Sequence, residues 1–234
     1  MPSRIDLNAD LGEGVTDDVG LLEVVTSANV ACGFHAGDEA TMRMVCEIAA
    51  ERGVAIGAQV SYRDRDGFGR RAMDVEGALL ASWVAEQVQV LSEIAAEFGI
   101  GVSYVKPHGA LYNRVIEDPA QAEAVLAGSA SLPVLTLPIG EFRERALGAG
   151  RHVRSEGFPD RGYRGDGRLL PRSEAGALVA DTAQIALNAV DLARRGIDSV
   201  CVHGDSPGAV AAAHRVRQEL ADAGYELRTL WGSA

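Results

Sequence analysis

The stretch VSYVKPHG, residues 102–109, decides the fold of this chain. It begins as a short β-rich run and passes directly into lysine, proline, histidine and glycine. The same order, a short apolar run followed by polar residues and glycine, recurs along the chain. Helical segments separate these units, and that alternation predicts a parallel sheet whose strands are joined by helical crossovers.

Seven runs are predicted strands because they are short, apolar or β-branched, and bounded by glycine or proline. They are residues 5–8, 28–32, 54–58, 102–106, 134–137, 152–156 and 199–203. The predicted helices are residues 38–52, 74–98, 119–127, 140–147, 173–195 and 206–223, and residues 225–230 suit a final edge strand. The last helix is expected to begin with Ser206 as N-cap and Pro207 as its first residue. The pattern favours an α/β fold, either a barrel or an open doubly wound sheet, with residues 1–234 in one domain.

Composition excludes several classes of protein. The net charge of -11 argues against a general nucleic-acid binder. Apolar residues make up 47% of the chain, yet no run is long enough to span a membrane and no signal peptide is visible. The three cysteines are an odd number without an export signal, so we expect free thiols in the cytoplasm.

Polar residues gather where the predicted strands end. The carboxyl ends of parallel strands share one edge of a barrel or sheet, and active sites of α/β proteins form at that edge. We expect three of the five histidines, several acids and the chain's single lysine there. The amino ends of the predicted strands carry no comparable cluster of polar residues. The residues that we predict to be catalytic are Asp10, His35, Lys106, His108, Glu156, His203 and Asp205. Asn8, Asp160 and Arg161 are predicted to bind substrate.

Lys106 is the only lysine among 22 basic residues. A chain that otherwise uses arginine keeps lysine where a compact charge with three donors on one atom is required. Chance is the alternative explanation of the residue alone, but its position at the active edge favours function. We therefore expect Lys106 to neutralise a phosphate or a developing oxyanion.

Two loops bring positive charge to the same edge. Residues 63–71 and 157–168 are rich in glycine, arginine and aromatic residues, as lids over an anionic ligand would be. A salt-bridged surface loop is the alternative. The turn at residues 204–208 opens a predicted helix, where free N–H groups could hold a phosphate or carboxylate. The chain has no Walker A motif, no G-x-S-x-G and no H-E-x-x-H.

Five segments together resemble the LamB/YcsF family, whose members are also called the A subunit of 5-oxoprolinase. They are DLNADLGE (6–13), NVACGFHAGD (29–38), KPHGALYN (106–113), EGFPDR (156–161) and CVHGD (201–205). The resemblance implies a distorted seven-stranded (β/α) TIM-like barrel, similar to the glycoside hydrolase/deacetylase fold. It also implies ATP-dependent opening of 5-oxoproline to L-glutamate, with ATP and Mg²⁺, together with 5-oxoprolinase subunits B and C. A homo-oligomer is compatible with the sequence.

One departure from the family concerns metal binding. The family usually carries Gly-Ala-His-Pro after the third strand, and here the run is Gly57-Ala58-Gln59-Val60. Glutamine cannot replace histidine as a base, so Gln59 argues against a protein-bound metal centre that uses this position. If Asp10 and His35 form the rest of such a site, Gln59→His would restore metal affinity.

The residue types suggest roles for the predicted site. His108 and His203 suit general acid–base catalysis, because imidazole titrates near neutral pH. Asp10, Glu156 and Asp205 would orient the histidines or activate water, and Arg161 suits a substrate carboxylate. Two alternatives remain: a metal-dependent deacetylase or amidohydrolase on the same fold, and a non-catalytic subunit of a lactam-utilising complex.

Overall fold

The computed structural model describes residues 3–15, 17–204 and 208–231. Its strands are β1 (Arg4–Leu11), β2 (Ser27–Ala31), β3 (Ala55–Val60), β4 (Val102–Pro107), β5 (Val134–Thr136), β6 (Val153–Gly157), β7 (Ser199–Val202) and β8 (Glu226–Leu227). Its helices are α1 (Asp18–Leu22), α2 (Glu39–Arg52), α3 (Gly77–Glu97), α4 (Gly109–Glu117), α5 (Pro119–Gly128), α6 (Glu141–Gly148), α7 (Thr182–Arg194) and α8 (Ala209–Asp222). Within this described part, no helix has the length and apolar character needed to cross a membrane.

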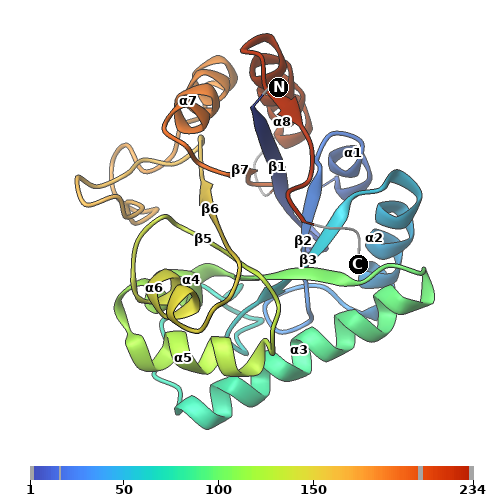
Figure 1. Ribbon diagram of the computed structural model, residues 1–234, viewed down its shortest axis with the longest axis vertical. Helices are drawn as coiled ribbons and strands as arrows, with labels where there is room; N and C mark the ends of the chain where they lie inside the picture. Colours follow the sequence, from blue (N-terminus) through green and yellow to red (C-terminus); the bar gives the residue numbers. More distant parts are fainter. Residues whose placement is uncertain (1–2, 16, 205–207, 232–234) are drawn as a thin grey trace.

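The strands β1 to β7 close into a parallel barrel. Neighbours follow the order β2-β3-β4-β5-β6-β7-β1, and β1 also pairs with β2, which completes the ring. The short β8 adds to the start of β1. Helices surround the strands, as Figure 1 shows for α2, α3, α5 and α8. The predicted TIM-like barrel is therefore confirmed, and all seven predicted strands are present.

Strand β1 shows how the barrel interior differs from an ordinary apolar core. Leu7 and Leu11 belong to the main apolar cluster, in which barrel and helix side chains pack together. The alternating residues Asp6, Asn8 and Asp10 point the other way and bond to residues of neighbouring strands. The sequence RIDLNADL encodes this alternation, whereas parallel strands buried on both faces usually form continuous apolar runs.

Aromatic packing fills the end of the barrel opposite the polar edge. Tyr104 is fully buried, stacks on Trp231 with ring centroids 4.3 Å apart, and donates a 2.7 Å hydrogen bond to Asn29 Oδ1. Gly57 lies opposite Tyr104 on the neighbouring strand. A Cβ atom at position 57 would come within 2.2 Å of the Tyr104 ring, so this cross-strand position accepts only glycine.

Helix starts differ from the sequence prediction at several places. Helix α3 begins at Gly77 rather than at residue 74, because the Glu76 side chain accepts from the N–H groups of Ala78 and Leu79 and caps it. Helix α4 and the short α1 were not predicted. The expected caps of the last helix, Ser206 and Pro207, lie outside the described residues.

The prediction for α7 was wrong by nine residues: the helix begins at Thr182, not at residue 173. Asp181 caps it by accepting from the Ala183 N–H. The residues before Thr182 do not join the helix, because Leu178 forms an antiparallel bridge with Arg161. Residues 158–181 thus form a long non-helical segment, gold to orange in Figure 1, between β6 and α7.

We predict that Gly57→Ala lowers the free energy of unfolding by about 1–3 kcal/mol, the usual cost of overpacking a core. The added methyl group would displace the Tyr104 ring and disturb its contacts with Asn29 and Trp231. Urea unfolding followed by circular dichroism measures the change. Gly77→Ala is the matched control, because a Cβ there meets no atom within 4 Å and should leave stability unchanged or slightly raised. Equal stabilities for the two variants would contradict the prediction.

Candidate active site

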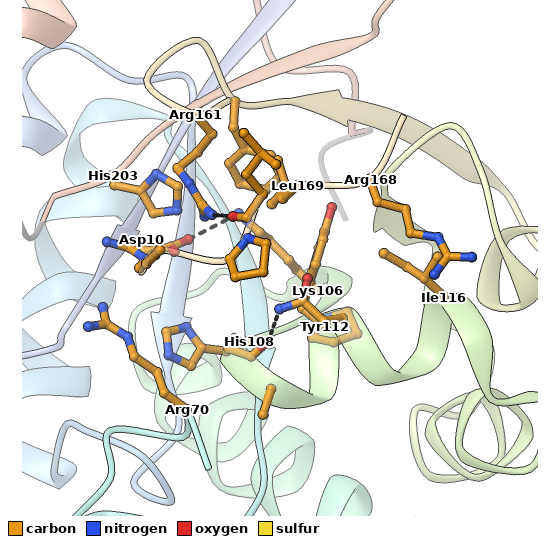
Figure 2. Close-up of a pocket in the computed structure, with 18 of the residues that line it drawn as sticks. Asp10, Arg70, Lys106, His108, Tyr112, Ile116, Arg161, Arg168, Leu169 and His203 are labelled. Atoms are coloured by element: carbon orange, nitrogen blue, oxygen red, sulfur yellow. Dashed lines mark hydrogen bonds and ion pairs between the residues drawn. The ribbon is translucent and has the colours of Figure 1, made fainter. Parts of the chain in front are cut away.

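A cavity of about 440 Å³ opens at the carboxyl ends of the barrel strands. Asp10, Lys106 and His203 bring side chains to it from the ends of β1, β4 and β7, and the segment 161–172 forms its opposite wall. Figure 2 shows these residues around one pocket, with Arg70 beside His108 and Arg168 beside Ile116. The edge at which the sequence places the polar residues is thus the edge that holds the cavity.

Lys106 lies between two carboxylates at the floor of this cavity. Its Nζ is 3.1 Å from Asp10 Oδ1 and 2.9 Å from Glu156 Oε2, and it also donates to Cys201 Sγ at 3.2 Å. The side chain is only 2% exposed. Burial disfavours the charge, but the neighbouring carboxylates outweigh it and raise the pKa of Lys106 well above its ordinary value. Lys106 is therefore a permanent cation and not a proton carrier.

The two carboxylates beside Lys106 differ in their protonation. Burial opposes ionisation of Asp10, but the cations Lys106 and His203 outweigh it and hold its pKa well below the ordinary range. For Glu156, burial dominates and raises the pKa, although Lys106 acts in the opposite direction. One ammonium cannot fully compensate two buried carboxylates, so Glu156 is the member of this pair that can carry a proton.

A ladder of polar side chains supports this site from inside the barrel. Asn29 Nδ2 donates to Asn8 Oδ1 at 2.7 Å and to Asp10 Oδ1 at 2.9 Å. Asn8 Nδ2 donates to Ser199 Oγ at 2.7 Å, and Ser199 Oγ donates to Asp6. Asn8 is fully buried in this ladder and does not line the cavity, so the structure places it beneath the predicted substrate site.

His203 and Asp160 form a second pair. The imidazole Nδ1 lies 2.8 Å from Asp160 Oδ2 and 3.0 Å from Asp160 Oδ1. Burial lowers the pKa of His203, but Asp160 more than offsets this and raises it overall. The pKa of Asp160 is lowered, because His203 and Arg161 outweigh the effect of burial. Among the described residues none is seen to bond the other imidazole nitrogen, Nε2, and His203 lines the cavity.

Arginine side chains make the outer cavity cationic. Five of them line it: Arg70, Arg161, Arg164, Arg168 and Arg172. Arg161 also holds the wall together, donating through Nε to Ala177 O and through Nη2 to Leu170 O. The segment 157–168 therefore lies over the cavity as expected, while its role as a mobile lid stays a prediction.

The loop at residues 63–71 is attached more firmly than a lid would be. Arg63 pairs with Glu86, Arg65 donates to the backbone of residues 33 and 37, and Arg71 pairs with Asp64. Within the loop, only Arg70 reaches the cavity. These pairs match the alternative given for the sequence, a salt-bridged surface loop.

A compact cluster forms the inner side of the cavity. Glu13 Oε1 lies 3.5 Å from both His35 Nε2 and His108 Nδ1, and the two imidazole rings stack 3.9 Å apart. Gln59 Nε2 lies 3.0 Å from Glu13 Oε1 and 2.9 Å from His108 Nδ1. Burial, with a contribution from His35, lowers the pKa of His108 well below its ordinary value. His108 is therefore neutral, in contrast to His203.

The structure brings most of the predicted residues together, in three groups. Lys106 contacts Asp10 and Glu156, His203 pairs with Asp160, and His35 and His108 meet around Glu13. Asp205 lies outside the described residues. Glu13 and Gln59 were not predicted as site residues, although Glu13 stands in the same polar run as Asp10. The signal for Glu13 in the sequence was an acidic side chain shortly after a predicted strand.

The chain is similar in sequence to proteins named as the A subunit of 5-oxoprolinase. The chain is 57% identical over 245 residues to the 5-oxoprolinase A subunit of Streptomyces avermitilis, with 95% of this chain and 98% of the relative covered. It is 50% identical over 246 residues to the protein of that name from Mycobacterium marinum, with 96% and 98% covered.

Solved structures agree with the fold. A lactam utilization protein from Thermus thermophilus is 35% identical and superposes with a TM-score of 0.90, covering 96% of this chain and 99% of its own. A family 4 carbohydrate esterase from Streptomyces lividans, 12% identical with a TM-score of 0.53 and coverage of 97% and 93%, shares the fold alone. The LamB/YcsF family profile matches residues 5–233. The chain belongs to the LamB/YcsF family.

Proposed function

We propose that this chain is the A subunit of an ATP-dependent 5-oxoprolinase, which opens the lactam of 5-oxoproline to give L-glutamate. The names of its relatives support a hydrolase that works as part of a multi-subunit enzyme. The observation that carries the proposal is Lys106, a permanent buried cation at the floor of a cavity lined by arginines. Such a cavity suits a small anionic substrate and a transferred phosphoryl group.

The substrate chemistry fits the charges of the site. A five-membered lactam is a stable amide. Bound ATP would supply a phosphoryl group to its oxygen, which makes the carbonyl carbon a better electrophile for water. The ring nitrogen would then leave, and the phosphoryl group would be released by hydrolysis as inorganic phosphate. The cavity, at about 440 Å³, has the size usual for small-molecule sites and is cationic enough for a carboxylate and phosphates. Lys106 would stabilise negative charge on the lactam oxygen or the phosphoryl group. Arg161 remains our candidate for the substrate carboxylate.

One group is placed to move a proton in the cavity. His203 donates its Nδ1 proton to Asp160, and this pairing keeps the imidazolium form available at higher pH than usual. Its Nε2 could then protonate the departing lactam nitrogen. Glu156, whose pKa burial raises, is fully buried and does not line the cavity, so it would act through its contact with Lys106. Asp10, held ionised, orients Lys106.

The relatives' names support a multi-subunit enzyme. These names designate one of several subunits, and we propose that 5-oxoprolinase subunits B and C are the partners of this chain. The decisive assay is glutamate release from 5-oxoproline by the chain with and without ATP and with and without subunits B and C. Release that requires all components supports the proposal. Release by the chain alone without ATP would support an amidohydrolase instead.

We predict that Lys106→Arg lowers turnover of the complete complex by about 100-fold or more, the usual effect of losing one well-placed electrostatic group. The longer guanidinium cannot keep the single-atom contacts with Asp10 and Glu156, and its extra volume costs about 1–3 kcal/mol of stability. Steady-state kinetics of folded protein, checked by circular dichroism, measures this loss.

Arg52→Lys is the matched control, because it exchanges the same two residue types on the exposed surface of α2. It should leave turnover unchanged. Near-normal turnover of Lys106→Arg would contradict the assignment. If variants of His203 also kept full turnover, the result would favour a non-catalytic role for this chain in the complex.

We predict that Asp160→Asn destabilises the protein by about 2 kcal/mol, the range of hydrogen bonds to charged groups, and that the loss depends on pH. Because Asp160 raises the pKa of His203, the charged pair stabilises the fold fully below the ordinary histidine pKa of about 6.5. This contribution disappears as pH rises through the raised value. The gap between wild type and variant should therefore be largest between about pH 5 and 6.5 and shrink above it.

Urea unfolding across this pH range measures the gap. Asp166→Asn is the control, because Asp166 is an exposed acid in the same segment that pairs with Arg168. A gap for Asp160→Asn that stays constant with pH would refute the role of the His203 charge.

A further inference from the structure

We propose that Glu13, His35 and His108 form a binding site for one divalent first-row transition-metal ion. One ligand atom from each residue lies within 4.8 Å of the other two, and all three side chains are almost completely buried. Glu13 and His35 lie in the loops that follow β1 and β2, and His108 comes directly after β4, so neighbouring strand ends of the barrel place the three together. The inference concerns binding by this chain and does not depend on the reaction proposed above.

The hydrogen bonds of His35 leave one nitrogen available to a metal. The Ser61 hydroxyl donates to the Tyr62 carbonyl, so its oxygen accepts the proton of His35 Nδ1 at 2.9 Å. The neutral ring then carries a bare lone pair on Nε2. That atom is buried, has no hydrogen-bond partner, and faces Glu13 Oε1 at 3.5 Å. A buried nitrogen without a partner is costly unless something else binds it.

His108 has the complementary arrangement. Its Nε2 lies 3.2 Å from the Phe68 carbonyl oxygen, which can only accept, so Nε2 carries the proton. The lone pair is then on Nδ1, which faces Glu13 Oε1 and accepts from Gln59 Nε2. In each histidine a backbone carbonyl or a hydroxyl thus fixes the tautomer that a metal requires, as the outer partners of metal ligands usually do.

The spacing of the ligand atoms suits a small ion. Ligands about 2.0–2.1 Å from a tetrahedral zinc ion are separated from each other by about 3.4 Å. The two distances from Glu13 Oε1, both 3.5 Å, match this separation. The two stacked rings, 13° apart, would tilt to aim both lone pairs at one ion. Two imidazoles with one carboxylate form a ligand set that is common for first-row divalent ions. Glu13 and His108 line the cavity, so a small molecule bound in the cavity could reach an ion held by these residues.

Gln59 stands where the family usually has a histidine, and it still contacts two of the proposed ligands. Its amide nitrogen donates to both Glu13 Oε1 and His108 Nδ1, and therefore bridges two of the atoms that an ion would bridge. Its amide oxygen is buried without a partner. Rotation of the amide by 180° would exchange the two atoms and turn the oxygen toward the ion. Gln59 thus fills the site in the free chain and offers a fourth, oxygen ligand in the bound one.

The test is direct metal binding by the whole chain. After removal of metals with a chelator, Zn²⁺ is titrated by calorimetry and Co²⁺ by visible absorption. We expect one ion per chain, and ligand-field bands for Co²⁺ typical of four or five nitrogen and oxygen ligands. Glu13→Gln should weaken Zn²⁺ binding by at least about 100-fold, since even the loss of an outer partner costs 10–100-fold. Glu117→Gln, which removes another carboxylate of the same cavity, should bind as wild type does.

A second variant keeps the test decisive if Glu13→Gln folds poorly. Gln59→His replaces the amide by an imidazole, which should tighten Zn²⁺ binding and shift the Co²⁺ bands, because residue 59 would touch the ion. Zn²⁺ should also raise the melting temperature of wild type and Glu117→Gln but not of folded Glu13→Gln. The proposal is overturned if wild type binds no ion, if Glu13→Gln binds as tightly as wild type, or if Gln59→His leaves the Co²⁺ spectrum unchanged.

Discussion

The ion pairs of one buried lysine with two carboxylates are the interaction on which the carboxyl ends of the barrel strands depend. Lys106 joins β4 to Asp10 on β1 and to Glu156 on β6, strands that are not neighbours in the ring. Without its charge, two carboxylates would face each other in a medium that solvates neither, and such a broken buried pair costs about 3–5 kcal/mol. The same charge that shapes the cavity floor therefore also holds the strand ends at their separation.

This central cation divides the cavity into two chemically different sides. Toward His203 and the arginines the environment favours positive charge and retained protons. Toward Glu13, His35 and His108 it offers lone pairs, because burial keeps His108 neutral. The two histidines that follow β4 and β7 thus have opposite pKa shifts, although both lie within one cavity. Residue type alone could not distinguish them, since the difference comes from Asp160 on one side and a stacked imidazole on the other.

Much of the fold could be predicted from the sequence, because strand ends in parallel α/β proteins meet at one edge and local patterns mark those ends. The site was predictable to the same extent: Asp10, Lys106, His108 and His203 each lie at or just beyond the end of a strand. Glu13 was missed although it follows β1 in the same polar run as Asp10, because only the turn after β1 brings its side chain to His35 and His108. The late start of α7 was missed because its cause, pairing of residues 161 and 178, is a tertiary contact.

The polar interior also matters before the barrel has closed. On a growing chain β1 can pair with β2 early, but its other partners, β7 and β8, are made about 190 and 220 residues later, as the pairings of Asp6 with Ser199 and of Arg4 with Glu226 show. Until then one edge of β1 is open, and open apolar edges invite association with other chains. Here the inward face of that edge carries Asp6, Asn8 and Asp10. This polar row, which supports the site in the finished fold, would make such association less favourable while the barrel is incomplete.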